Sequence, residues 1–174
     1  MTDSPTLPHK ISTLIFAFND RDEVLLMRRQ GAPNAGLWSP FGGKLNRETG
    51  ESPHQCAARE TGEEIGLRVR PGDLHLAGMV AERAYEGNTH WLMFMFELKF
   101  RLQKLPPPHE EGIFEFVPLP EVINRPIPAT DREVLWPLFL KNRGGFFSVA
   151  IVCRPDGRLE WDVEETLVQL RSEK

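Results

Sequence analysis

Residues 42–67, GGKLNRETGESPHQCAARETGEEIGL, combine a glycine turn with a short segment that carries clear helix start and stop signals. Ser52 is a good N-cap, Pro53 suits the first helical position, and Gln55 completes a capping box three residues after the cap. Gly66 is the residue type that most often ends a helix in the left-handed conformation. The stretch therefore predicts a glycine turn followed by a helix between Ser52 and Gly66.

The predicted helix carries three carboxylates on one face. Glu60, Glu63 and Glu64 are spaced i, i+3 and i+4, and each like-charged pair weakens an isolated helix by roughly a few tenths of a kcal/mol. A divalent cation would offset this repulsion, and Mg²⁺ prefers hard oxygen ligands beside substrate phosphates. The backbone carbonyl of Gly43 would add another oxygen. A solvated acidic helix, with Arg59 as the ion-pair partner, explains the same pattern without a metal.

The stretch resembles the signature of the Nudix hydrolases, G-x5-E-x7-R-E-U-x-E-E-x-G-U, in which U is apolar. Glu51 and residues 59–67 follow its second part in register. Seven residues, in place of five, separate Gly43 from Glu51, and Thr61 stands where the signature has an apolar residue. A loop tolerates such an insertion, and threonine can pack or hydrogen-bond back to a backbone carbonyl. The resemblance implies an α/β/α sandwich with a mixed central β-sheet.

The resemblance also implies a magnesium-dependent hydrolase of phosphoanhydride bonds, with Mn²⁺ as an alternative ion. The metal ligands it implies are Gly43, Glu60, Glu63 and Glu64. Arg59 would orient these carboxylates through a salt bridge with Glu51. Members of the family take their general base from this helix or from a later loop, so three candidates stay open, namely Glu60, Glu110 and Glu111.

Two more stretches, residues 34–44 and 136–162, resemble the oxidised-purine nucleoside triphosphatases within this family. That resemblance implies hydrolysis of a damaged nucleotide such as 8-oxo-dGTP to the monophosphate and pyrophosphate. Asp131 matches one of two purine-binding aspartates, and Arg132 replaces the other. Ser39 stands where those enzymes carry an asparagine, which changes how the base edge is read. The expected substrate contacts are Asp131, Ser39, Phe41, Lys44 and Arg28.

Two alternatives stay open. Dinucleoside polyphosphate hydrolases often carry a tyrosine beyond the signature, and Tyr85 is the only tyrosine of this chain. ADP-ribose hydrolases tend to carry a proline in the same region, where this chain has Glu82 and Arg83. A non-catalytic nucleotide-binding module is the alternative of another class, and the intact set of Arg59 and the three glutamates argues against it.

The composition is that of a globular domain: 174 residues, 40% hydrophobic and 26% charged. We expect a flexible tail over residues 1–9 and a single domain over residues 10–174. The net charge of −4 argues against a nucleic-acid polymer as partner, and no apolar run reaches membrane-spanning length. Cys56 and Cys153 form no disulfide framework or metal-ligand spacing, so we expect a reduced, cytoplasmic protein. The expected partner is a small nucleotide, and the protein is expected to be a monomer or a homodimer.

The remaining pattern predicts mostly strands. Residues 11–18 and 23–29 are predicted to form a hairpin, 67–69 and 74–83 to be extended, 91–100 to be a central strand, and 113–117 to be a short strand. Residues 85–88 read as a turn. A second capping box at Thr130 predicts a helix to about Lys141. A last hairpin is predicted over residues 146–153 and 158–163, followed by a short helix or a fraying tail over residues 164–174.

Overall fold

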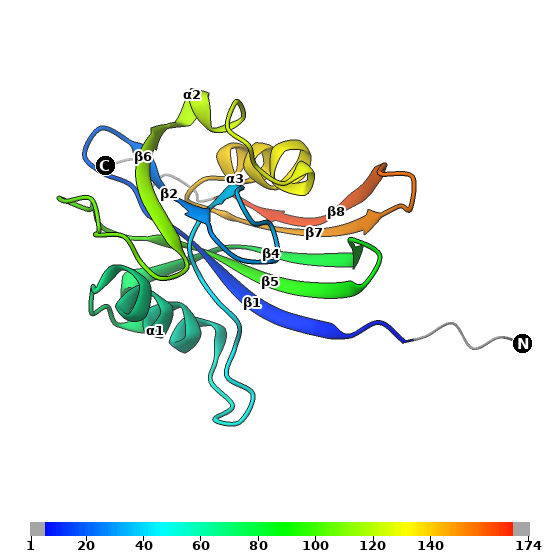
Figure 1. Ribbon diagram of the computed structural model, residues 1–174, viewed down its shortest axis with the longest axis horizontal. Coiled ribbons are helices and arrows are strands. Elements are labelled where there is room, and N and C mark those ends of the chain that lie inside the picture. The colour runs from blue at the N-terminus through cyan, green and yellow to red at the C-terminus, as the bar shows by residue number, and fades with distance from the viewer. Residues whose placement is uncertain (1–5, 169–174) are drawn as a thin grey trace, which may run out of the picture.

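A five-stranded mixed sheet runs through the middle of the protein in the computed structural model, which describes residues 6–168 (Figure 1). Its strand order is β1 (His9–Phe16), β5 (Thr89–Leu98), β4 (Leu74–Tyr85), β7 (Phe146–Cys153) and β8 (Leu159–Leu167). The β1–β5 and β4–β7 pairs are parallel, and the β4–β5 and β7–β8 pairs are antiparallel. The predicted mixed sheet is confirmed, with β5 as an internal strand and β4 at its centre.

A second, three-stranded sheet has the order β3 (Trp38–Ser39), β2 (Glu23–Arg29) and β6 (Gly112–Pro118). The predicted hairpin between the first two strands is therefore wrong, because β1 and β2 belong to different sheets. The turn at Asn19 does form, and one antiparallel bridge joins Phe18 to Val24. Beyond that bridge β2 diverges, because residues 24–27 are all fully buried and need a core on both faces.

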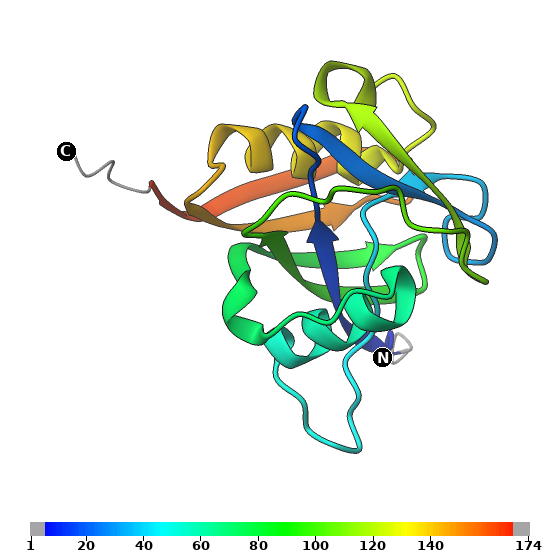
Figure 2. The same ribbon diagram turned by 90° about the vertical axis from the view of Figure 1, so that its left-hand side faces the viewer.

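One helix covers each face of the main sheet (Figures 1 and 2). Below it in Figure 1 lies α1 (Pro53–Ile65), and above it the π-helical turn η2 (Asp131–Leu135) continues into α3 (Trp136–Lys141). Two hydrophobic clusters fill the two interfaces, and neighbouring residues of β1 alternate between them: Ile15 packs on the α1 side and Phe16 on the α3 side. The expected α/β/α sandwich is confirmed. Short turns η1 (Pro71–Asp73) and α2 (Leu119–Val122) complete the described elements.

The helix after Pro128 begins differently from the prediction. Thr130 already has helical dihedral angles, φ −60° and ψ −39°, and its side chain makes no cap hydrogen bond, so the predicted capping box is absent. The amide of Arg132 donates to the carbonyl of Pro128 at 3.0 Å. Because the helix starts before Thr130, the threonine side chain is free to face the pocket described below.

Three boundaries also differ. Strand β8 continues to Leu167, where a helix or tail was predicted, because it pairs with β7 as far as Phe146. Residues 67–69 form no strand, and β1 already begins at His9, inside the predicted tail. The rest of both predicted ends, residues 1–5 and 169–174, lies outside the described residues. Within residues 6–168 no helix is long and apolar enough to cross a membrane.

Candidate active site

The helix α1 begins and ends at the residues that its sequence predicts. The Ser52 side chain accepts from the Gln55 amide at 3.2 Å, and the Gln55 side chain accepts from the Ser52 amide at 2.8 Å, so the capping box is complete. Gly66 ends the helix with φ 69°. Thr61 is fully buried and donates to the carbonyl of Ala57 at 2.7 Å, which explains why a threonine fits at this apolar position.

Arg59 hydrogen-bonds to three carboxylates and fixes their positions. Its guanidinium donates twice to Glu51, at 2.6 and 3.1 Å, as the sequence predicts. It also donates to Glu60 at 2.7 Å and to Glu63 at 3.0 Å. A fifth bond, at 3.2 Å, reaches the carbonyl of Lys44 and links the glycine turn to the helix. A lysine has no planar fork and could not make these bonds together.

The inserted loop before the helix is built around Asn46. Its side chain accepts from the amides of Glu48 and Thr49 at 3.0 and 3.2 Å, a local turn typical of asparagine. The backbone amide of Asn46 donates to the Glu51 carboxylate at 2.6 Å, so the loop and Arg59 both hydrogen-bond to this carboxylate. Figures 1 and 2 both show this loop extending away from the sheet beside α1. The two extra residues therefore leave the register of the helix unchanged.

Gly43 lies directly against the carboxylate of Glu60. A Cβ atom at this position would be 2.2 Å from Glu60 Oε1 and 2.6 Å from Oε2, so only glycine leaves room. The Gly43 carbonyl accepts from the amide of Thr13 at 2.8 Å, a bond that the sequence did not predict. The same oxygen also accepts from the Thr13 hydroxyl at 3.4 Å and from the Cys56 thiol at 3.7 Å, so a metal would have to replace these longer contacts, and its role as a metal ligand stays a prediction.

Two of the three helix glutamates are buried. Burial raises the pKa of Glu60, and Arg59 partly counteracts the shift. Burial and the nearby charges of Glu111 and Glu60 raise the pKa of Glu64 to about 8. The Gly42 amide donates to Glu64 Oε1 at 3.3 Å, but Oε2 is buried and has no hydrogen-bond partner. Glu63 is largely exposed, with 58% of its side chain accessible.

The chemistry of this cluster fits a hard divalent cation. It offers several carboxylate oxygens, a buried oxygen without a partner on Glu64, and raised pKa values that a nearby cation would lower. Within the described part of the chain, however, no three acidic, histidine or cysteine side chains already converge as a metal cage. Arg59 occupies Glu60 and Glu63, so a metal would replace part of these contacts.

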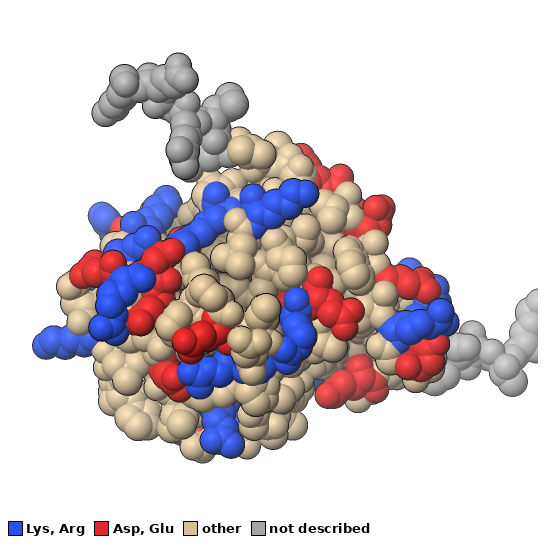
Figure 3. Space-filling view, turned by 90° about the horizontal axis from the view of Figure 1, so that it is seen from above, with Lys and Arg blue, Asp and Glu red and all other residues tan. Residues whose placement is uncertain are grey.

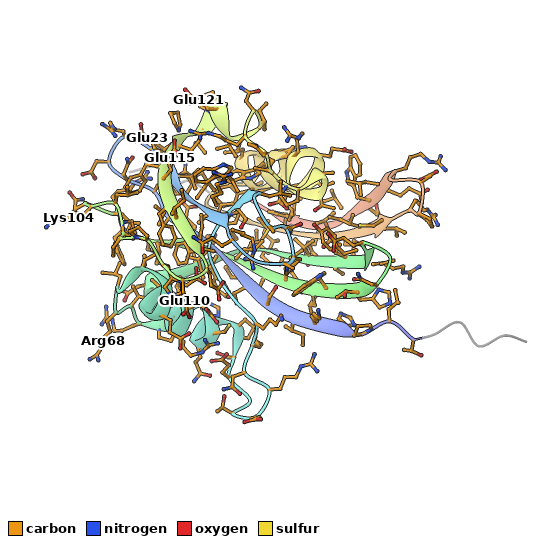
Figure 4. The ribbon with its side chains drawn as sticks, viewed as in Figure 1. Glu23, Arg68, Lys104, Glu110, Glu115 and Glu121 are labelled. Carbon is orange, nitrogen blue, oxygen red and sulfur yellow. The ribbon has the colours of Figure 1, made fainter. Side chains whose placement is uncertain are left out.

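Two of the helix glutamates, Glu60 and Glu63, line a pocket of about 600 Å³, a size typical of small-molecule sites. At this end it is lined by Gly43, Lys44, Glu60 and Glu63 from the turn and helix, and by Glu110 and Glu111 from the loop before β6. Figure 4 shows the labelled Glu110 over α1. Both loop glutamates are exposed, and the charge of Glu111 raises the pKa of Glu60 and Glu64.

The other end of the pocket holds two buried acids. Asp131 and Ser39, both predicted substrate contacts, line it together with Glu82 of β4, which the sequence analysis did not select. Glu82 is only 4% exposed and Asp131 8%. Burial together with the charge of Asp131 raises the pKa of Glu82 to about 7, burial raises that of Asp131 to about 7, and a hydrogen bond from Thr130 counteracts the shift at both. The Oε1 atom of Glu82 is buried without a hydrogen-bond partner.

Two predicted substrate contacts do not line the pocket. Arg28 is exposed, and it is the next residue, Arg29, whose side chain reaches the pocket and lowers the pKa of Glu64. Phe41 is fully buried in the α1-side core, edge-on to Phe114 with ring centroids 6.4 Å apart. Tyr85 does line the pocket, and its hydroxyl donates to the Asn34 side chain at 2.5 Å.

The outer surface shows no comparable concentration of one charge on the face seen in Figure 3, where Lys and Arg side chains lie interspersed with Asp and Glu. The acidic groups that repel each other are instead gathered inside the pocket. This contrast marks the pocket as the place where a ligand would relieve unfavourable electrostatics.

Comparisons with known proteins agree with this geometry. A profile of the NUDIX domain matches residues 8–138. The RNA pyrophosphohydrolase of Gluconobacter oxydans (strain 621H) is 33% identical over 141 residues, 72% of this chain and 81% of that protein. The oxidized purine nucleoside triphosphate hydrolase of Danio rerio is 39% identical over 71 residues, 41% of this chain and 42% of that protein. The MutT protein from Bacillus halodurans shares the fold, with a TM-score of 0.67 at 24% identity over 89% of this chain and 97% of that one. The chain therefore belongs to the NUDIX domain family and is a Nudix pyrophosphohydrolase.

Proposed function

We propose that this protein hydrolyses a purine nucleoside triphosphate, with a damaged nucleotide such as 8-oxo-dGTP as the preferred substrate, to the monophosphate and pyrophosphate. The observation that carries the proposal is the division of one pocket between two chemistries. The α1 end has the carboxylates and basic groups that a triphosphate needs, and the Asp131 end has buried polar groups suited to a base edge. The name of the Danio rerio relative supports the same substrate class.

Nudix hydrolases generally use a divalent metal, and for this chain we propose Mg²⁺, with Mn²⁺ as an alternative. Glu60, Glu63 and Glu64 would hold it, with the Gly43 carbonyl as a further candidate. When bound, it would neutralise phosphate oxygens and lower the pKa of a water molecule.

The protein's own residues contribute orientation and charge. Arg59 fixes the carboxylates of Glu51 and Glu60 relative to each other. Lys44 and Arg29, which line the pocket, place positive charge where phosphate oxygens would lie. Preorganised charges of this kind stabilise the transition state without reorganising during the reaction.

The proton of the attacking water needs a carboxylate that is not occupied elsewhere. Glu110 and Glu111 are exposed at the pocket, whereas Glu60 is held by Arg59. These contacts support a loop glutamate as the base. Glu110→Gln, Glu111→Gln and Glu60→Gln, each assayed across pH, identify it: the variant whose kcat/KM no longer falls on the acid side of the profile has lost the base.

Product analysis with Mg²⁺ tests the proposal. We expect 8-oxo-dGTP to be hydrolysed faster than dGTP, dATP, ADP-ribose and diadenosine tetraphosphate, with release of pyrophosphate and monophosphate. A short 5′-triphosphorylated RNA belongs in the panel because the Gluconobacter oxydans relative is an RNA pyrophosphohydrolase. Faster turnover of that RNA or of ADP-ribose would replace the proposed substrate.

A dinucleoside polyphosphate is the second candidate, and one contact favours it. Tyr85 lines the pocket near Asp131, with its hydroxyl fixed by Asn34, and could stack on a second base. Preference for diadenosine tetraphosphate, lost in Tyr85→Ala, would support this function in place of the triphosphatase.

A further inference from the structure

We propose that Glu82 pairs with Asp131 to bind the polar edge of a guanine-type base, one with two adjacent N–H donors and a carbonyl acceptor. This inference rests on the proposed function, since it names the groups that select the base of that substrate. It assigns the selection to a residue of β4 that the family signature does not include.

The position of Glu82 has no structural explanation. It lies in the middle of the main sheet, with Trp91 of β5 and Ile151 of β7 as its cross-strand neighbours. An unpartnered carboxylate oxygen in such a place costs stability, since buried polar atoms are normally hydrogen-bonded. A bound partner can reach Glu82 from the pocket, because Glu82 lines the pocket.

The groups around Glu82 do not supply that partner. Besides its own burial, two neighbours act on the pKa of Glu82, the charge of Asp131 and the hydroxyl of Thr130, and neither neighbour is a cation. Tyr85 of the same strand and Cys153 of β7 are the other titratable groups that feel its charge. A bound ligand with N–H donors would satisfy the oxygen that these neighbours leave free.

The pair offers both hydrogen-bonding senses at once. Burial raises the pKa of both carboxyls, and the charge of Asp131 raises that of Glu82 as well, so one member keeps a proton to a higher pH than an exposed acid does. The ionised member accepts two N–H bonds, and the protonated member donates one O–H bond. The edge of guanine provides the complement, an N1–H and an exocyclic amino group beside the O6 carbonyl. Cytosine and thymine present a smaller ring and a different pattern.

Binding of nucleoside monophosphates tests the pair without hydrolysis. Calorimetry at pH 7 compares dGMP, dIMP, which lacks the exocyclic amino group, and dCMP on the wild type, Glu82→Gln and Glu133→Gln. Glu133 is the matched control, because it is exposed, lies two residues after Asp131 and does not line the pocket. We expect Glu82→Gln to weaken dGMP binding about 10-fold to 100-fold with little effect on dCMP, and Glu133→Gln to change neither.

The wild type alone provides a second test, which holds even if Glu82→Gln does not fold. It should bind dGMP about 10-fold more tightly than dIMP, because the carboxylate loses one donor. Equal affinity for dGMP and dIMP, or an unchanged order of affinities in folded Glu82→Gln, would overturn the inference. Since no phosphoanhydride is cleaved in these experiments, they separate a failure of base recognition from a failure of the proposed hydrolysis.

Discussion

The substitution Gly43→Ala is expected to remove activity and leave the fold intact. The added Cβ would lie 2.2 Å from Glu60 Oε1, whereas ordinary van der Waals contact begins at 3.4 Å. The carboxylate must therefore move by roughly 1 Å, and a displacement of that size at a reaction centre costs about 100-fold in rate. The obstacle is the end of a flexible side chain, so we expect the free energy of unfolding to change by about 1 kcal/mol or less.

Two other glycines provide the comparison. At Gly42 an added Cβ would meet the backbone oxygen of Thr13 at 2.1 Å, and φ is +145°, so Gly42→Ala should lower the free energy of unfolding well beyond Gly43→Ala. At Gly72 a Cβ meets nothing within 4 Å, so Gly72→Ala should change neither property.

Urea unfolding and pyrophosphate release with Mg²⁺ measure the two effects separately. The reasoning is refuted if Gly43→Ala keeps kcat/KM within about threefold of the wild type while Gly42→Ala behaves as expected. Glu60 would then lie away from the reacting atoms, and the close approach of Gly43 would serve packing alone.

Three further predictions concern the two acidic ends of the pocket. Arg59→Lys should lower kcat/KM by about 10-fold to 100-fold in the pyrophosphate assay, because one ammonium cannot hold Glu51 and Glu60 together; unchanged kinetics would contradict this. Glu82→Gln should raise the melting temperature more at pH 8 than at pH 5. A folded-state pKa of about 7 against 4.5 means that the cost to the native state grows as pH rises from 4.5 to 7 and reaches about 3 kcal/mol at most; an equal shift at both pH values would exclude this origin. Mg²⁺ at 100 times its Kd at pH 8.5 should stabilise the wild type by about 2.7 kcal/mol. The same Mg²⁺ concentration should stabilise it less at pH 6.5, because protons compete for Glu64, and calorimetric scans of Glu64→Gln should show a smaller gain; an equal gain at both pH values would contradict this.

The parts of this protein that sequence predicts well are those fixed by local chemistry. The capping box at Ser52 and the stop at Gly66 involve residues within one or two helical turns, so they form as expected. The second capping box had the same pattern, but Thr130 is already helical and belongs to the pocket. There the helix starts two residues earlier than predicted, directly after Pro128, and burial of Asp131 within the fold outweighs the local preference for a cap.

The pairing of β2 could not be read from its neighbours in sequence. A turn at Asn19 is compatible with a hairpin, and the choice depends on partners more than 80 residues away in β6. The fully apolar run at residues 24–27 did carry a usable indication, because a strand buried on both faces does not suit the edge position of an isolated hairpin.

Strand alternation explains how two charged residues outside the expected substrate contacts, Arg29 and Glu82, come to line the pocket. In β2, Leu25 and Met27 face the α1-side core, so Arg29 rather than Arg28 points toward the glutamates. In β4, Glu82 lies two residues after the buried Val80 and shares its face. An acid at an inward position of an otherwise apolar strand is the pattern that would have identified it.

The buried acids at both ends of the pocket cost the empty protein stability. Glu64 and Glu82 each keep a buried oxygen without a partner, and both pKa values are raised by burial before any charge is counted. Apolar side chains at these positions would stabilise the empty protein. Glu82 of β4 lines the pocket, and Glu64 lies on α1, whose Glu60 and Glu63 line it. The ligand that relieves both must be cationic or metal-bound at one end and rich in N–H donors at the other. A nucleoside polyphosphate with its metal ion meets both requirements. The stability lost by burying Glu64 therefore argues for a metal, and the stability lost by burying Glu82 argues equally for recognition of a base.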